Sequence, residues 1–228
     1  MTKTSDSIRY VSAPSLSKNI SSDNSSPSIP RRLALVLDMD ECLIHSIFQH
    51  DNIYQRYPSY KDSFEISTSE GERAIVNKRP GLDAFLREAA KSFDLYVFTA
   101  GLRVYGEPIL DALDPKGTIF KDRFYREDCV WRDGFYLKDL RVVREDLSRV
   151  VLVDNNLLSF VLQPRNGIPV PNFIDDANDR ALESLTRVLN SLVDHDDVRP
   201  HLDYLFRVAN CLAEHHLATR LNRDLVHS

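Results

Sequence analysis

Two aspartates separated by one residue follow a short apolar run, and their spacing could support covalent phosphate chemistry. The run from Leu33 to Leu37 leads directly into Asp38-Met39-Asp40-Glu41. A continuous apolar run of this length indicates a strand that is buried on both faces. Carboxylates at positions i and i+2 after such a strand can share one site and still face different directions. One of them could attack phosphorus, since carboxylates form covalent phosphoryl intermediates, while the other transfers protons.

A carboxylate nucleophile needs positive charge nearby, because a dianionic phosphate repels it. A hard cation bound by oxygen atoms would supply that charge, and the sequence therefore predicts Mg²⁺ as the cofactor. The alternative interpretation is that Asp38 and Asp40 only end a strand or cap a helix. The polar residues expected at the same edge of the sheet, described next, decide between a catalytic site and this alternative.

Two further apolar runs also end in polar residues, at Thr99 after Phe93 and at Asp154 after Val150. Ligands of open parallel sheets bind beyond the carboxyl ends of the strands. Asp38, Thr99 and Asp154 are therefore expected to meet at one edge of the sheet. Each residue alone is weak evidence, because Thr is common in strands and Asp-Asn is common in turns.

Helical patterns separate these strands. Pro80 marks a helix start, and apolar residues recur at helical spacing in three stretches, 82–89, 104–113 and 182–192. Strands that alternate with helices favour an α/β domain with a mainly parallel sheet.

Two stretches break this alternation and predict small β insertions. Residues 63–77 read as two short strands around Ser69-Glu70-Gly71, and residues 124–138 as a hairpin that turns at Asp133-Gly134. Residues 201–222 predict a final amphipathic helix. We expect this helix to pack on the domain, with a docking role as the alternative.

The segment that begins at Leu33 resembles a known family. Asp38-Met39-Asp40-Glu41-Cys42 is similar to the Asp-x-Asp-x-Thr/Val signature of the haloacid-dehalogenase superfamily, and more narrowly to the NLI-interacting-factor-like small phosphatases that act on the C-terminal domain of RNA polymerase II. The resemblance runs to about Val198. Its further motifs follow in the family's order: Lys78-Arg79-Pro80, Val97-Phe98-Thr99-Ala100, Phe124-Tyr125-Arg126-Glu127, Tyr136-Leu137-Lys138-Asp139-Leu140 and Val153-Asp154-Asn155.

The resemblance implies a haloacid-dehalogenase-like, Rossmann-type α/β fold. Helices would flank the mainly parallel sheet, which would carry a small β insertion and a C-terminal helical extension. We expect a disordered Ser-rich tail over residues 1–30, a phosphatase domain over 31–198 and the helical extension over 199–228. The tail could instead be a mitochondrial transit peptide, but it lacks an arginine-rich face and a clear amphipathic period.

The resemblance also implies roles for the residues of the site. Asp38 would be the nucleophile and would bind Mg²⁺ through its carboxylate. Asp40 would bind Mg²⁺ through its backbone carbonyl, and its side chain would protonate the leaving serine or threonine oxygen and then activate water. Asn155 would be the third protein ligand of the metal.

Further positions would hold the substrate. Thr99 and Lys138 would hold the phosphate, with Lys138 offsetting its charge and Asp154 orienting Lys138. Without the resemblance, Lys138 reads as a solvated charge. Contacts with the rest of the phosphorylated peptide would come from Arg126 and from an apolar pocket for a proline-containing segment, lined by Phe48, Leu102 and Tyr105. Ordinary packing is the alternative for these last three residues.

The sequence departs from the family pattern at two places in the motifs. Cys42 stands where the signature has Thr or Val, and Asn156-Leu157 stands where relatives often have Ser-Pro. We expect Cys42 to pack, with an oxidisable thiol as the alternative.

Composition limits the class of protein. The 228 residues are 43% hydrophobic, which suits one globular domain with a tail. The net charge of -5 and the absence of a basic run argue against direct binding of nucleic acid. The cysteines are too few and scattered for a disulfide framework or a zinc site, which fits a reducing compartment (Cys42, Cys129, Cys211). No apolar stretch approaches the roughly 20 residues of a membrane-spanning helix, so we expect no membrane anchor.

The sequence thus predicts a Mg²⁺-dependent phosphatase that acts on phosphoserine or phosphothreonine in a phosphoprotein substrate through an aspartyl-phosphate. Peptides like the C-terminal domain of RNA polymerase II are candidate substrates. We expect a monomer in the nucleus or cytoplasm rather than in mitochondria. One alternative is a peptide-binding module of the kind found in protein-import receptors, and another is a small-molecule or lipid phosphatase. The flat, lidless opening expected from the short spacer after Asp38 favours a protein substrate.

Overall fold

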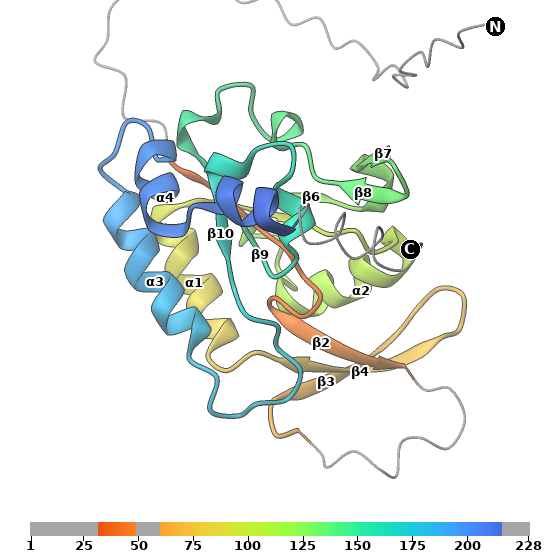
Figure 1. Ribbon diagram of the computed structural model, residues 1–228. Coiled ribbons are helices and arrows are strands. Elements are labelled where there is room, and N and C mark those ends of the chain that lie inside the picture. The colour runs from red at the N-terminus through yellow and green to blue at the C-terminus, as the bar shows by residue number, and fades with distance from the viewer. Residues whose placement is uncertain (1–31, 49–59, 216–228) are drawn as a thin grey trace, which may run out of the picture. The chain divides into compact units, whose positions relative to one another are not determined.

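A five-stranded parallel sheet forms the centre of the molecule (Figure 1). The computed structural model describes residues 32–48 and 60–215. The expected tail over 1–30 and residues 216–228 of the expected extension lie outside the described residues. The strand order is β10-β9-β1-β5-β6. The strands span Ala34–Leu37 (β1), Asp94–Phe98 (β5), Phe120–Phe124 (β6), Val150–Asp154 (β9) and Gly167–Pro169 (β10).

The two faces of the sheet are covered in different ways. Successive residues of a strand point to opposite faces, so Leu35 and Leu37 join a core with the three long helices, while Ala34 and Val36 join a second core. The helices are α1 (Leu82–Ser92), α2 (Arg103–Leu113) and α3 (Ala181–Leu192). Figure 1 shows α1 and α3 side by side on the first face. The second core contains residues of short 3₁₀ turns, η3 (Leu140–Val142) and η5 (Leu157–Phe160), and of the helical segment 208–215.

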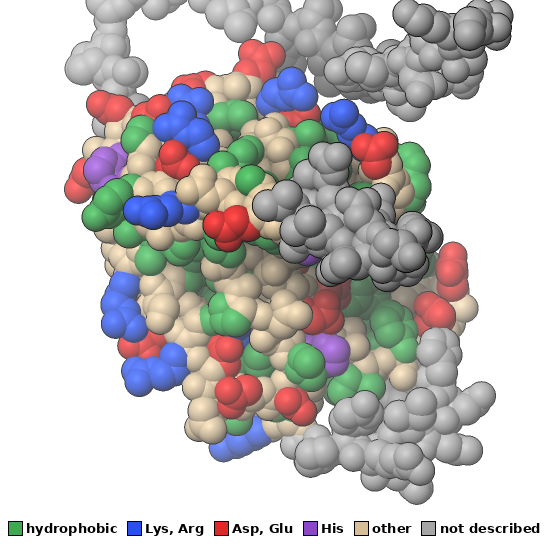
Figure 2. Space-filling view, in the orientation of Figure 1, with side chains coloured by type: hydrophobic (Ala, Val, Ile, Leu, Met, Phe, Trp, Pro, Cys, Tyr) green, Lys and Arg blue, Asp and Glu red, His purple; other side chains and the backbone are tan. Residues whose placement is uncertain are grey.

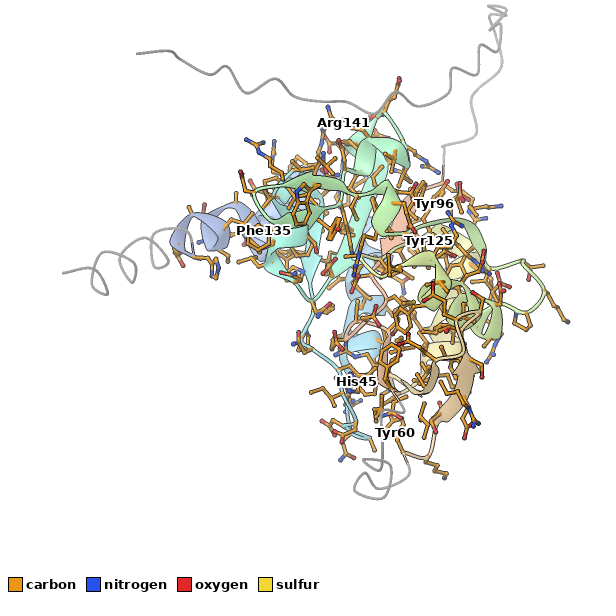
Figure 3. The ribbon with its side chains drawn as sticks, turned by 90° about the vertical axis from the view of Figure 1, so that its right-hand side faces the viewer. His45, Tyr60, Tyr96, Tyr125, Phe135 and Arg141 are labelled. Carbon is orange, nitrogen blue, oxygen red and sulfur yellow. The ribbon has the colours of Figure 1, made fainter. Side chains whose placement is uncertain are left out.

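The first insertion is a separate antiparallel sheet with the strand order β2-β4-β3. Its strands are β2 (Ile44–Phe48), β3 (Ser63–Ser67) and β4 (Arg73–Lys78). The sequence predicted β3 and β4 but not β2, whose residues are mostly half-buried and therefore lack a clear alternation. Figure 3 shows this sheet, marked by His45 on β2, at the end of the molecule opposite to Arg141.

The second insertion is a hairpin made of β7 (Val130–Arg132) and β8 (Phe135–Leu137). Its turn residues Asp133 and Gly134 both have positive φ angles, 52° and 87°, as the Asp-Gly pair predicts. The expected start at residue 124 was wrong. Phe124 instead ends β6, and a 3₁₀ turn, η2 (Arg126–Asp128), precedes β7.

The C-terminal region is not the single helix that the amphipathic pattern predicted. The helix α4 (Arg199–Phe206) ends at Arg207, whose φ angle of 48° is left-handed, and residues 208–215 form a second helical segment. The break has a packing reason, because Leu202 is buried in the core of the first sheet face and Val208 in the core of the second. Both parts therefore pack on the domain.

Charges are mixed on the surface. On the face shown in Figure 2, Lys and Arg side chains are interspersed with Asp and Glu and do not form one basic patch. Among the described residues, no helix has the length and apolar character that crossing a membrane requires.

Gly167 offers a test of how tightly the second core is packed. A Cβ atom at this position of β10 would lie 2.5 Å from Cδ1 of the buried Phe160 ring. Overpacking of this kind costs about 1–3 kcal/mol, so we expect Gly167→Ala to lower the free energy of unfolding by that amount in urea titrations. The double variant Gly167→Ala/Phe160→Leu should recover part of the loss. Additive effects of the two changes would show that the contact does not limit stability.

Candidate active site

The carboxyl ends of three adjacent strands bring the predicted polar residues together. Leu37 of β1 pairs with Val97 of β5 and with Val153 of β9, so the next residues of each strand lie at one edge of the sheet. The N–H of Asp38 donates to the carbonyl of Val153 over 2.9 Å. This edge opens into a pocket of about 530 Å³, and all ten predicted site residues line it (Asp38, Asp40, Phe48, Thr99, Leu102, Tyr105, Arg126, Lys138, Asp154, Asn155).

A tight turn directly after Asp40 shapes the floor of the pocket. The N–H groups of Leu43 and Ile44 donate to the carbonyl of Met39, and Glu41 has a φ angle of 55°. Residues other than glycine seldom adopt this left-handed conformation, and such outliers concentrate at functional sites. The turn thus reverses the chain while the side chains of Asp40 and Glu41 remain at the pocket.

Arg79 holds this turn in place, a role that the sequence motif around it did not reveal. Its side chain is fully buried and donates to the carbonyl of Cys42 over 2.8 Å and to that of Pro171 over 2.9 Å. Two further bonds, of 2.8 and 2.7 Å, join its guanidinium to the carboxylate of Asp179. Because a guanidinium can satisfy several acceptors in one plane, Arg79 links three segments beneath the site.

Lys138 lies buried between two carboxylates. Its Nζ is 2.5 Å from Oδ1 of Asp38 and 2.6 Å from Oδ2 of Asp154, and the residue is only 2% exposed. Burial alone would lower the pKa of Lys138, but the charges of Asp154 and Asp38 outweigh burial and raise it. Lys138 is therefore a permanent cation here, not the solvated charge that its local sequence suggests.

One lysine does not neutralise two carboxylates. Burial raises the pKa of Asp38, the nearby charge of Asp154 raises it further, and Lys138 opposes both effects. An ionised Asp38 therefore needs more positive charge than Lys138 supplies, and a divalent cation would provide it.

The oxygen atoms around Asn155 fit such a cation. Its amide nitrogen donates to Oδ1 of Asn172 over 3.1 Å. The other end of the amide then lies 3.0 Å from Oδ2 of Asp38 and 3.3 Å from the backbone oxygen of Asp40. Oxygens bound side by side to one Mg²⁺ at about 2.1 Å are about 3 Å apart. An amide oxygen can face two acceptors at these distances when a cation lies among them, so this donor set is compatible with Mg²⁺.

Asp40 accepts hydrogen bonds from hydroxyl groups, whereas Asp38 is paired with the ammonium of Lys138. The hydroxyl of Thr99 donates to its Oδ2 over 3.4 Å, and the hydroxyl of Tyr105 donates to its Oδ1. Burial raises the pKa of Asp40, although the hydrogen bond from Tyr105 acts against this. Among the described residues no cation is paired with Asp40, and a carboxyl group with a raised pKa in such surroundings is suited to carry a proton.

Tyr105 therefore does more than line an apolar pocket. Its phenol oxygen also lies 2.7 Å from Oγ of Ser46. Since the phenol has a single hydrogen and gives it to Asp40, the serine hydroxyl is the donor in this second bond. The sequence did not point to Ser46, which belongs to the unpredicted strand β2, and nothing in its local pattern distinguishes it from an ordinary strand residue.

The proposed phosphate-binding side of the pocket is formed by the segment after β5. Thr99 is buried, and its hydroxyl oxygen accepts the N–H of Gly101 over 2.9 Å. Nε of Arg126 donates to the carbonyl of Ala100 over 2.6 Å, which holds the guanidinium at the rim. The apolar side is formed by Phe48 and Tyr105, whose ring centroids are 5.3 Å apart, and by the exposed Leu102.

The two departures from the family motifs have local explanations. Cys42 is buried, and burial raises the pKa of its thiol well above the ordinary value, which favours packing over oxidation. Asn156 caps the turn η5, since its side-chain oxygen accepts the N–H of Leu158 over 3.0 Å. Its own N–H donates to Oδ1 of Asp154 over 2.8 Å, so the departure still supports the site.

Comparison with known proteins places this site in a family. The family model described as "NLI interacting factor-like phosphatase" matches residues 33–199. The chain is 37% identical over 193 residues to CTD small phosphatase-like protein 2 of Dictyostelium discoideum, an alignment that covers 84% of this chain and 32% of the relative. It is 38% identical over 174 residues to CTD nuclear envelope phosphatase 1B of Danio rerio, covering 74% of this chain and 70% of the relative.

A third relative is the mouse (Mus musculus) protein named carboxy-terminal domain RNA polymerase II polypeptide A small phosphatase 2, which is 37% identical over 76% of this chain and 62% of its own length. The chain thus spans 32%, 70% and 62% of the lengths of these curated relatives. The matched residues contain every part of the pocket described above. This chain belongs to the NLI interacting factor-like phosphatase family.

Proposed function

We propose that this protein hydrolyses phosphoserine and phosphothreonine in other proteins through an aspartyl-phosphate on Asp38. The observation that carries the proposal is the different surroundings of two carboxylates in one pocket. Asp38 is paired with the buried ammonium of Lys138, whereas Asp40 is bonded to the hydroxyls of Thr99 and Tyr105. Two carboxyl groups whose environments differ in this way can divide the roles of nucleophile and acid.

The reaction then proceeds in two displacements at phosphorus. In the first, a carboxylate oxygen of Asp38 bonds to phosphorus while the bond to the serine or threonine oxygen breaks, and Asp40 gives that oxygen its proton. Lys138 and the hydroxyl of Thr99 hold the phosphoryl oxygens. In the second, the oxygen of a water molecule bonds to phosphorus while the bond from phosphorus to Asp38 breaks, and the Asp40 carboxylate takes a proton from that water. Phosphate leaves, and both aspartates return to their starting states.

Mg²⁺ would be held by the carboxylate of Asp38, the backbone carbonyl of Asp40 and the side-chain oxygen of Asn155. When bound, it supplies the positive charge that lets a carboxylate approach a phosphate dianion.

The surroundings of the pocket favour a polypeptide substrate. The apolar side formed by Phe48, Leu102 and Tyr105 and the guanidinium of Arg126 border the same pocket as Asp38. Phosphate alone would use neither, but residues beside a phosphorylated side chain could use both. The name of the mouse relative supports peptides like the C-terminal domain of RNA polymerase II as candidates. That of the zebrafish relative supports action at the nucleus.

A burst experiment with Asp40→Asn tests this division of roles. p-Nitrophenolate leaves without needing a proton, so the first displacement on p-nitrophenyl phosphate should survive. The second displacement needs the base, so turnover should fall about 10²- to 10³-fold. Rapid mixing with Mg²⁺ should therefore release one equivalent of nitrophenol per enzyme before slow turnover.

The matched control is the exposed Asp122→Asn, which should turn over like the unmodified protein. A steady state without a burst in Asp40→Asn would exclude a base role that is specific to the second displacement. If the unmodified protein neither turns over nor shows a burst, while phosphopeptides still bind, the peptide-binding alternative is correct instead.

A further inference from the structure

The hairpin formed by β7 and β8 exposes apolar side chains that neither core explains. Four of its residues are more than two-fifths exposed: Val130 at 41%, Trp131 at 60%, Phe135 at 51% and Tyr136 at 41%. Figure 3 labels Phe135 on this hairpin. Large apolar side chains that gather on one surface element commonly mark an interaction site. Trp131 and Tyr136 pair across the hairpin and share one face, whereas Val130 and Phe135 belong to the other face. We call these four residues the aromatic hairpin, and the face with Trp131 and Tyr136 is the one considered below.

The aromatic hairpin is continuous with the active-site pocket. The ring centroids of Tyr136 and Trp131 are 4.6 Å apart. Cζ of Arg126 lies 5.0 Å from the ring centroid of Tyr136. Tyr136 and Arg126 both line the pocket, whereas Trp131 lies beyond it. A row of three neighbouring side chains therefore leads from the phosphate-binding side of the site onto the outer surface.

The hairpin also has a fixed position relative to the reacting groups. Leu137 of β8 is buried and is followed directly by Lys138, which is bonded to Asp38 and Asp154. The N–H of Arg126 donates to the carbonyl of Gly101 over 3.0 Å, which ties the start of this segment to the loop after β5. Whatever binds the hairpin is therefore held at a defined place beside the phosphoryl group.

We infer that the aromatic hairpin binds an apolar or proline-containing segment of the substrate polypeptide, next to the phosphorylated residue. This inference rests on the proposed function and adds a second contact surface to the apolar side formed by Phe48, Leu102 and Tyr105. An extended peptide advances about 3.3 Å per residue, so a few residues reach from the pocket across this row of side chains. Rigid aromatic side chains bind apolar and proline-containing segments well, because they bury much area and lose little conformational freedom.

The continuity of the row Trp131-Tyr136-Arg126 with the pocket favours the substrate as occupant. A small phosphate ester would fill the pocket and leave Trp131 exposed. Two other occupants are residues 216–228 of this chain and a second copy of the protein, and the experiment below separates them from the substrate.

Trp131 is the single tryptophan of the sequence, so its fluorescence reports on the hairpin alone. We would titrate the full chain carrying Asp38→Asn, which prevents turnover, with two phosphoserine peptides in Mg²⁺. One peptide has proline and leucine beside the phosphoserine, and the other has glycine and serine there. We expect the first to shift the Trp131 emission to shorter wavelength, because it removes the indole from water, and the second to leave it unchanged.

Kinetics on the active protein give the second readout. In Trp131→Ala, kcat/KM for the proline- and leucine-flanked peptide should fall about ten- to a hundredfold, mainly through KM. Activity on p-nitrophenyl phosphate should stay within about twofold. The matched control is Tyr204→Ala, which removes an exposed aromatic side chain from α4 and should change neither activity.

Several outcomes would overturn the inference. Equal losses on the peptide and on p-nitrophenyl phosphate would mean that the hairpin only supports Lys138. If Trp131→Ala and a chain that ends at residue 215 both gain activity on both peptides, the C-terminal residues are the occupant. A dimer that dissociates in Trp131→Ala would identify a second copy instead. If the unmodified protein does not hydrolyse p-nitrophenyl phosphate at all, the proposed function is rejected. The fluorescence titration would still test whether the hairpin binds the peptide.

Discussion

Asp38→Asn is expected to lower the hydrolysis of p-nitrophenyl phosphate by at least about 10⁴-fold, as losses of catalytic nucleophiles do in other enzymes. The amide has nearly the same size as the carboxylate but cannot form an aspartyl-phosphate. It also removes an anionic oxygen that lies 3.0 Å from the side chain of Asn155. Nucleophilic attack and affinity for Mg²⁺ should therefore weaken together. Steady-state rates with and without added Mg²⁺ measure the effect.

The loss of activity should not come from unfolding. Asp38 is buried next to Asp154, and this arrangement disfavours its charge, as the direction of its pKa shift shows. A neutral amide removes that repulsion, so we expect Asp38→Asn to unfold at a temperature equal to or above that of the unmodified protein. Activity that persists in a folded Asp38→Asn protein would exclude the aspartyl-phosphate on Asp38 and would mean that another nucleophile attacks phosphorus.

Simple rules were sufficient to predict the centre of this site from the sequence. Three apolar runs end at Asp38, Thr99 and Asp154, and parallel strands place their carboxyl ends at one edge. The structure confirms the strands and the place where those residues meet. The physical reason is that strands buried on both faces carry continuous apolar runs, which leave a strong local signal.

Other parts depend on contacts between distant segments and leave no such signal. Lys138 lies 100 residues from Asp38 in sequence, and only the family resemblance suggested that the two are related. The hydroxyl of Tyr105 reaches Asp40 because α2 and the turn after β1 border the same pocket, and no pattern within either segment encodes that contact. The residues before and after the break at Arg207 pack in two different cores. A helical period that continues through Arg207 therefore does not reveal that the helix ends there.

Lys138→Met is expected to destabilise the protein by about 3–5 kcal/mol near neutral pH, because it leaves buried carboxylates without their cation. Methionine fills a similar volume, so lost packing contributes little. The same change removes the charge that offsets the phosphate, and activity should fall strongly as well. Urea titrations at several pH values measure the stability, and the exposed Lys121→Met is the matched control.

The loss of stability should depend on pH in a definite direction. Burial and the charge of Asp154 already raise the pKa of Asp38, and Lys138→Met removes the cation that opposes both effects. The folded variant therefore binds a proton more tightly than the unfolded chain does, whose aspartates titrate near about pH 4. A carboxyl group with a raised folded pKa contributes stability below its unfolded pKa and loses that contribution as pH rises through the folded value. The deficit of Lys138→Met should therefore be small near pH 4 and grow towards neutral pH.

Mg²⁺ gives an independent check on the same charges. If the oxygens of Asp38, Asp40 and Asn155 hold a cation, Mg²⁺ should raise the unfolding temperature of Lys138→Met more than that of the unmodified protein, because it replaces part of the missing positive charge. Ca²⁺, which prefers longer bonds and more ligands, should do so less. A deficit that neither shrinks in acid nor responds to Mg²⁺ would mean that Lys138 stabilises the fold through packing. In that case the two carboxylates it touches would not need its charge to remain buried, and the electrostatic basis for an ionised Asp38 would be wrong.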